Sequence, residues 1–309
     1  MSSPLSINHK RSTINPFHER HRDLGLEPII NATGTVTRLG GAILPAKVLA
    51  ALEADRETPL EQLQDAASRR IAKITGAEAG LVTTGAAAAL TLGTAAILAG
   101  NDLARMERLP DTRGMRHEFL VAREQRNGYD HAVRAAGATL VEVGFNEIIA
   151  GAGVRRTEAW EYEAAISERT AGILYVYNRS SRPPLSEVAE VAQRHRLPLI
   201  VDAAGGLPPR SNLTALITAG ADLVCFSGGK GDARAAGNGN PVRAAGAGVV
   251  GRAADARHGR SPGVVESTGF HRAAATRLAA ARDRAELQGR QGADCRTAGG
   301  ARTVRVGGV

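Results

Sequence analysis

Residues 197–202 read LPLIVD, and residues 223–230 read LVCFSGGK. Each stretch is a short apolar run that ends at a polar residue, which is the pattern of a buried strand. Between them, residues 212–219 (NLTALITA) have the composition of a helix. Two buried strands separated by one helix predict a βαβ unit, and therefore a parallel sheet whose right-handed crossovers place helices on its faces.

The rest of residues 28–230 repeats this alternation. Further strands are predicted at residues 81–83, 118–122, 139–143 and 172–177, and helices at residues 46–54, 58–74, 86–98, 129–136, 160–168 and 186–195. We expect 223–226 to be the last strand and residues 1–27 to form a separate N-terminal segment. The prediction is an α/β fold with a mostly parallel sheet. Ligands of such sheets bind at the carboxyl ends of the strands, so the residues after each strand are the functional candidates.

The composition favours a folded cytoplasmic protein. Of the 309 residues, 43% are hydrophobic and 23% charged, which is enough apolar material for a buried core. Cys225 and Cys295 are too few for a disulfide framework or a four-ligand zinc site and indicate a reducing compartment. The N-terminus lacks the apolar region of a secretory signal. Residues 80–100 are uncharged and long enough to span a bilayer, but the turn at Gly85 divides them into a strand and a buried helix.

The composition changes after Lys230. Residues 231–309 carry 13 arginines and 6 acidic residues, so +7 of the formal charge of +8 belongs to them. Ala, Gly and Arg supply 47 of these 79 residues, too little large apolar surface for a core, and only residues 276–287 look helical. Two interpretations are open: a disordered low-complexity basic tail, or the out-of-frame translation of a GC-rich gene. The DNA around codon 231 would distinguish them. Nucleic-acid binding would rest on this tail alone.

Lys230 stands between glycines at the end of the last predicted strand. A P-loop would need Gly at the position of Val224 and Ser or Thr at that of Gly231, so binding of a nucleoside triphosphate is not supported. A partly desolvated lysine there suits a covalent imine with an aldehyde cofactor, because burial lowers the pKa of the amine and the neutral amine is the nucleophile. The alternative is a turn lysine that points to solvent.

Asp202 closes the neighbouring predicted strand. A carboxylate at this strand end can pair with the protonated pyridine nitrogen of pyridoxal phosphate, which keeps the ring an electron sink. The alternative is a cap or turn aspartate before Ala203-Ala204-Gly205-Gly206. The strand–helix–strand spacing places Asp202 and Lys230 on one rim of the sheet, which favours the cofactor interpretation.

Residues 83–88 (TTGAAA) follow a short strand and open a helix. Their backbone N–H groups are unhindered by side chains and can hold a phosphate with help from the helix dipole. The candidates are Thr84, Gly85, Ala86 and Ala87, with Ser227 reaching the same phosphate from the lysine turn. Close packing of a helix on a strand through small residues is the alternative.

Arg126, Tyr129 and His131 follow the predicted strand 118–122. This mixture of a cation, an aromatic ring and an imidazole suits contact with a substrate or cofactor. The alternative is a solvated turn in which Asp130 caps a helix.

Arg179 and Arg182 follow the predicted strand 172–177 and can bind a substrate carboxylate or phosphate. Solvated loop charges are the alternative. Asn31, Thr33 and Thr35 form a predicted turn near the mouth of the site.

Residues 246–251 (GAGVVG) match the dinucleotide pattern G-x-G-x-x-G. No hydrophobic strand precedes them, and they lie in the Ala/Gly/Arg-rich segment where such a match arises by chance. We therefore do not expect a dinucleotide site.

Together, several motifs resemble one known family. They are PIINATGTVTRLGG (28–41), ARMERLPDTRGM (104–115), QRNGYDHAVRAAGATLVEVG (125–144), LPLIVDAAGGLPP (197–209) and ADLVCFSGGKG (221–231). They resemble the selenocysteine synthase (L-seryl-tRNA(Sec) selenium transferase) group, whose relatives include D-glucosaminate-6-phosphate ammonia-lyase. The resemblance covers about residues 28–230 and implies the large domain of a fold-type-I pyridoxal-phosphate enzyme.

The resemblance also implies a chemistry. Lys230 would form the imine with pyridoxal 5'-phosphate, Asp202 would meet the pyridine nitrogen, and residues 84–87 with Ser227 would hold the phosphate. The implied reaction is that of a lyase or transferase, of the α,β-elimination type, on a small amino-acid substrate, without a metal. A homo-oligomer is implied, in which the neighbouring subunit completes the site.

Three departures from the family matter. After Lys230 the chain reads GDARAAGNGN in place of a stretch like IRGPQ, so the C-terminal small domain is expected to be absent or replaced by the low-complexity tail. Only residues 1–27 precede the match, so a tRNA substrate is not expected. Gly206 stands where we expect an acidic residue in close relatives, so the chemistry near Asp202 is expected to differ. The alternative function is a truncated, inactive remnant that acts at most as a binding or interaction protein.

Overall fold

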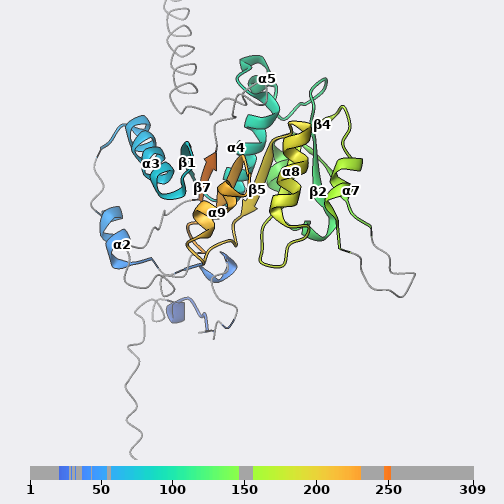
Figure 1. Cartoon of the computed structure of the whole chain (residues 1–309). Helices are drawn as coiled ribbons and strands as arrows, with labels where there is room; N and C mark the ends of the chain where they lie inside the picture. Colours follow the sequence, from blue (N-terminus) through green and yellow to red (C-terminus); the bar gives the residue numbers. More distant parts are fainter. Residues whose placement is uncertain are drawn as a thin grey trace, which may run out of the picture.

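The centre of the protein is one seven-stranded sheet in the order β1-β7-β6-β5-β4-β2-β3 (Figure 1). The computed structural model describes residues 21–27, 29, 32, 37–42, 44–53, 57–145, 156–230 and 247–251. The strands are β1 (Ala79–Thr83), β2 (Glu118–Ala122), β3 (Thr139–Val143), β4 (Thr170–Val176), β5 (Leu199–Ala203), β6 (Leu223–Phe226) and β7 (Ala247–Gly251). From β3 to β6 all pairings are parallel, and β7 runs antiparallel to both β1 and β6. The predicted mostly parallel α/β sheet is confirmed.

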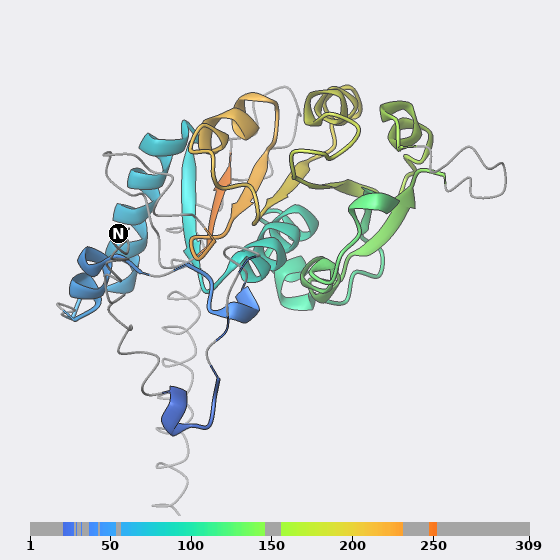
Figure 2. The ribbon, with the colours of Figure 1, turned by 90° about the horizontal axis from the view of Figure 1, so that it is seen from below.

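Helices cover both faces of the sheet, as Figure 2 shows from below. α4 and α6 pack on one face, and α7, α8 and α9 on the other. The helical segments are η1 (Thr37–Leu39), α2 (Ala46–Glu53), α3 (Leu60–Thr75), α4 (Ala86–Ala99), α5 (Leu103–Arg108), η2 (Arg123–Gln125), α6 (Asp130–Ala135), α7 (Ala159–Ala164), α8 (Leu185–His195) and α9 (Asn212–Thr218). Within the described ranges, no helix is long and apolar enough to cross a membrane.

The two helical layers explain why the central strands are apolar throughout. Successive residues of a strand point to opposite faces. Ile200 packs into the core on the α4/α6 face, and Val201 into the core on the α8/α9 face. A strand buried on both faces has no polar side to show, which produces runs such as LIV in β5.

One edge of the sheet collects the carboxyl ends of β1, β2, β4, β5 and β6, because these strands run in the same direction. In register, Asp202 lies between Val176 of β4 and Cys225 of β6. Thr83 of β1 and Phe226 of β6 flank the first residues of β7. Two strand spacings, about 10 Å, therefore separate the ends of β1 and β6.

The strand β7 corrects the expectation that residues 223–226 end the sheet. It lies in the Ala/Gly/Arg-rich segment and coincides with the G-x-G-x-x-G match, so this glycine pattern belongs to a sheet strand. Two valines among alanines and glycines are too short an apolar run to predict a strand; pairing on both sides defines it. The rest of residues 231–309, with the predicted helix 276–287, lies outside the described residues, as do Asn31, Thr33 and Thr35.

Removing β7 should destabilise the fold. A chain that ends at Lys230 loses the strand that joins β1 to β6. We expect its thermal midpoint to fall by at least about 5 °C, because each kcal/mol corresponds to about 2–4 °C in a domain of this size. A chain that ends at Ala256 keeps β7 and is the matched control. Equal midpoints of the two chains in circular dichroism would contradict this role of β7.

Candidate functional site

Asp202 and Lys230 meet at the carboxyl edge of the sheet. Asp202 lies one residue before the end of β5, on the α4/α6 face that it shares with Ile200. Lys230 follows β6 in a short turn, in which its N–H donates to the Ser227 carbonyl at 3.4 Å. Because β5 and β6 are neighbours in the sheet, the carboxylate and the amine approach the same place.

The Asp202 carboxyl group is buried, with 7% of the residue exposed. This burial raises the pKa of Asp202 above its ordinary value. The N–H of Ala204, which donates to Asp202 Oδ1 at 3.0 Å, lowers the pKa, as does the positive charge of Lys230, while the charge of Asp130 raises it. The amine of Lys230 therefore acts electrostatically on this carboxylate, as the sequence predicted for a shared rim.

Tyr129 supplies an aromatic ring beside the amine. Lys230 Nζ lies 5.4 Å from the centroid of this ring, within the range of a cation–π contact. Tyr129 immediately precedes α6 and is 50% exposed, so much of the ring surface remains accessible. The predicted site residues Tyr129, Lys230 and Asp202 are thus brought together.

The turn between β1 and α4 lies on the same edge of the sheet. Gly85 precedes the first residue of α4, and Thr83 Oγ1 donates to the Gly85 carbonyl at 2.9 Å. Thr84 and Ala87 are exposed, and the first N–H groups of a helix have no acceptor within the helix. The predicted phosphate-binding turn and Ser227 therefore share this edge, with β7 between their strands.

Arg126 is engaged by the protein's own carboxylates. Its guanidinium forms ion pairs with Asp130 and Glu142, and Glu142 also accepts from Arg123 at 2.9 Å. Asp130 raises the pKa of Arg126, chiefly through its hydrogen bond. The guanidinium of Arg126, which the sequence suggested as a ligand contact, therefore links Glu142 near the end of β3 to Asp130 at the start of α6.

The other two predicted contact residues are exposed. His131 lies on α6, and Arg179 lies in the loop after β4. In the described part of the chain, Arg179 makes no ion pair. Its guanidinium is therefore accessible to an anion from solution.

Asp130 is a site residue that the sequence suggested only as a helix cap. It is buried, its Oδ2 is held by Arg126, and within the described residues its Oδ1 has no hydrogen-bond partner. A buried carboxylate oxygen without a donor is unfavourable, and such oxygens are rare in folded proteins. Arg126 precedes α6 and lies outside any helix, so no helical spacing marked this ion pair in the sequence.

A second group that sequence reasoning missed packs against the lysine turn. Ala42 N–H donates to the Gly229 carbonyl at 2.8 Å, and a Cβ on Gly41 would lie 2.7 Å from the same oxygen. Gly41 also has a φ of +69°, which side chains rarely adopt. The paired glycines of RLGGA were the signal for this close approach.

Gly206 is tightly enclosed as well. A Cβ there would lie 3.1 Å from the Ala203 carbonyl and 3.3 Å from the Tyr177 ring. An acidic side chain, as expected in close relatives, would require these neighbours to shift.

The described ranges hold no group of three or more His, Cys, Asp or Glu residues arranged for a metal ion. Burial raises the pKa of the Cys225 thiol well above its ordinary value, and the Asp202 charge adds to this. The thiol therefore stays protonated and is a poor nucleophile.

Comparison with known proteins agrees with this arrangement. Residues 29–236 match the family model of SelA, L-seryl-tRNA selenium transferase. The chain belongs to this family. The match includes β1 to β6 and the turn that carries Lys230.

Proteins that are similar to this chain are named for different reactions. D-glucosaminate-6-phosphate ammonia lyase of Salmonella typhimurium is 31% identical over 220 residues, covering 68% of this chain and 56% of the relative. The 5'-C-glycyluridine monooxygenase-decarboxylase of a Streptomyces species is 33% identical over 220 residues, covering 68% and 53%. An L-seryl-tRNA(Sec) selenium transferase of Desulfovibrio desulfuricans is 30% identical over 230 residues, covering 65% and 45%. The chain spans about half the length of these relatives.

A solved structure supports the fold assignment. The structure of D-glucosaminate-6-phosphate ammonia-lyase is 30% identical, with a TM-score of 0.63, and the similarity covers 78% of this chain and 61% of that one. The predicted fold-type-I architecture is therefore confirmed.

Asp202→Asn should stabilise the chain at neutral pH when no ligand is added. Because the folded-state pKa of Asp202 is raised, the folded chain binds its proton more tightly than the unfolded chain. Stability therefore falls as the pH rises from the ordinary value of 3.8 through the raised pKa, and it stays lower above that pKa. The asparagine oxygen can still accept from Ala204.

Urea unfolding across the acid-to-neutral range measures this effect. The variant should unfold at higher urea than the native chain at pH 7, and the two should converge near pH 3.5. A variant that is less stable than the native chain at pH 7 would contradict this, because it would show that nearby groups fully compensate the Asp202 carboxylate for its lost hydration.

Proposed function

We propose that this chain binds pyridoxal 5'-phosphate at the carboxyl edge of its sheet and acts as a lyase or transferase on an amino acid. The observation that carries the proposal is the placement of Lys230 and the buried Asp202 at the ends of neighbouring parallel strands, where the charge of the amine acts on the carboxylate. An aldehyde cofactor with a basic ring nitrogen needs these two groups, an amine for the aldehyde carbon and an acid partner for the nitrogen.

The residues around this pair fit the cofactor. The sequence has four lysines, at positions 10, 47, 73 and 230, and Lys47 and Lys73 are exposed on α2 and α3. Among the described lysines, only Lys230 follows a strand at the site edge. The exposed ring of Tyr129 offers a stacking surface, and the N–H groups of residues 84–87 with the Ser227 hydroxyl offer donors to a phosphate.

In the proposed mechanism, each residue has a separate task. When bound, pyridoxal 5'-phosphate supplies an electron sink for the negative charge at the substrate's α-carbon. The carboxylate of Asp202 would keep a proton on the ring nitrogen. Lys230 would take the α-proton of the substrate on Nζ as a general base. The electron pair left by that proton then expels a group from the β-carbon, which is an α,β-elimination.

The names of the relatives support one substrate class. The names glucosaminate, seryl and glycyl each denote a molecule with an amino-acid group. We propose a small-molecule amino acid with a leaving group next to the α-carbon as the substrate. The alternative is an inactive remnant, which the change of composition after Lys230 supports.

Lys230→Ala should abolish covalent cofactor binding. The chain incubated with pyridoxal 5'-phosphate and then desalted should show an absorbance band in the violet, which Lys230→Ala lacks. Lys73→Ala changes an exposed lysine of α3 and should keep the band. Colourless native protein of normal circular dichroism would support the inactive remnant.

We further propose that the chain works in the cytoplasm as a homo-oligomer, with residues 28–230 and β7 as the cofactor-binding unit. Exposed leucines on α2 and α3, at positions 49, 52, 60 and 63, support an interface with a second copy. Light scattering of the purified chain would measure its mass, and a monomer would contradict this part of the proposal.

A further inference from the structure

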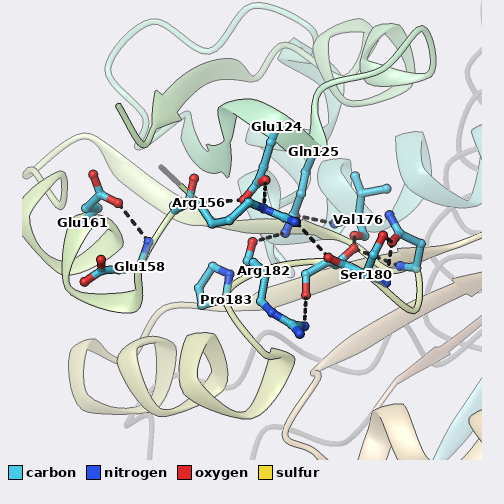
Figure 3. Close-up of polar contacts among 12 residues, drawn as sticks. Glu124, Gln125, Arg156, Glu158, Glu161, Val176, Ser180, Arg182 and Pro183 are labelled. Carbon is cyan, nitrogen blue, oxygen red and sulfur yellow. Dashed lines mark hydrogen bonds and ion pairs between the residues drawn. The ribbon is translucent and has the colours of Figure 1, made fainter. Parts of the chain in front are cut away.

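Gln125 joins the end of β2 to the loop that follows β4 (Figure 3). Its side chain is buried, with 5% of the residue exposed, and both ends of its amide are used. Nε2 donates to the Arg182 carbonyl at 3.0 Å, and Oε1 accepts from the N–H of Val176 at 2.9 Å. Val176 and Arg182 bracket residues 177–181, so one buried side chain fastens both ends of this loop.

The loop is also fixed from within. Ser181 Oγ donates to the Val176 carbonyl at 2.7 Å and accepts from Asn178 N–H at 3.0 Å. Asn178 Oδ1 accepts from Ser180 N–H at 2.8 Å. Arg156 donates to the Ser180 carbonyl at 2.8 Å, as Figure 3 shows. These bonds restrain the loop.

The loop of residues 177–181 carries an exposed cation, Arg179, at the carboxyl edge of the sheet. Its first residue, Tyr177, donates its N–H to the backbone carbonyl of Asp202 at 2.9 Å, so the loop begins next to the end of β5. Arg179 is exposed and, within the described residues, has no carboxylate partner. Arg126, by contrast, is engaged by Asp130 and Glu142.

We infer that Gln125 is a positioning residue that holds the loop so that Arg179 binds an anionic group of the substrate. The inference rests on the proposed function and deepens it by naming the substrate class: an amino acid recognised through a carboxylate or a phosphate. A guanidinium binds either anion through paired hydrogen bonds whose geometry is strict. A loop fixed before binding loses less conformational entropy on binding, which explains a buried amide at this position.

The test uses the full chain loaded with pyridoxal 5'-phosphate and calorimetric titration with L-serine and O-phospho-L-serine. Arg179→Gln should weaken binding about 10- to 100-fold, the effect of losing a charged hydrogen-bond pair. Gln125→Met keeps a similar volume and should weaken binding by a smaller factor while the violet band of Lys230 is unchanged. Arg70→Gln, on exposed α3, is the charge-matched control and should bind as the native chain does.

The two titrants identify the anion. An equal loss for both ligands assigns Arg179 to the carboxylate, and a loss confined to O-phospho-L-serine assigns it to the phosphate. Unchanged binding of both ligands to Arg179→Gln would overturn the inference, and so would an equal loss in Arg70→Gln.

The double variant separates positioning from general destabilisation. If Gln125 acts through Arg179, adding Gln125→Met to Arg179→Gln should weaken binding no further. A full additional loss of affinity in the double variant would overturn the positioning role of Gln125. If Gln125→Met fails to fold, the affinity of Arg179→Gln alone decides the anion site. A violet band with unchanged affinities would reject this inference and leave the proposed function standing; no band in the native chain would reject both.

Discussion

A carboxylate buried at the edge of a parallel sheet is the constraint on which this structure depends. Removing Asp202 from water is unfavourable unless nearby donors or cations compensate for the lost hydration. The N–H of Ala204 and the charge of Lys230 supply part of that compensation, and the raised pKa of Asp202 shows that it is incomplete. A cationic ring nitrogen beside Asp202 would complete it, so the unfavourable burial favours the proposed ligand.

The placement of the two groups follows from backbone geometry. Neighbouring parallel strands end at the same edge, and the turn after β6 is short, so Lys230 cannot be far from Asp202. This part could be predicted from sequence, because a strand buried on both faces leaves an unbroken apolar run. The helix α4 could be predicted as well: it was expected at residues 86–98 and is found at Ala86–Ala99.

Elements defined by distant partners could not be predicted. β7 becomes a strand through β1 and β6, and its own five residues carry little signal. The six-residue helix α5 depends on Asp102, which accepts from the N–H groups of Ala104 and Arg105. Gln125 bonds residues 51 and 57 positions away, and no local pattern marks it. For Arg126, the sequence showed the charge but not the carboxylates that engage it.

The most direct test of the account is to locate the cofactor's covalent attachment. The chain loaded with pyridoxal 5'-phosphate is reduced with borohydride, digested with trypsin and analysed by mass spectrometry. We predict one pyridoxyl group, on Lys230, in a peptide of residues 211–234 that trypsin leaves uncut at that lysine. A pyridoxyl group on Lys47 or Lys73, or none on any lysine, would contradict it.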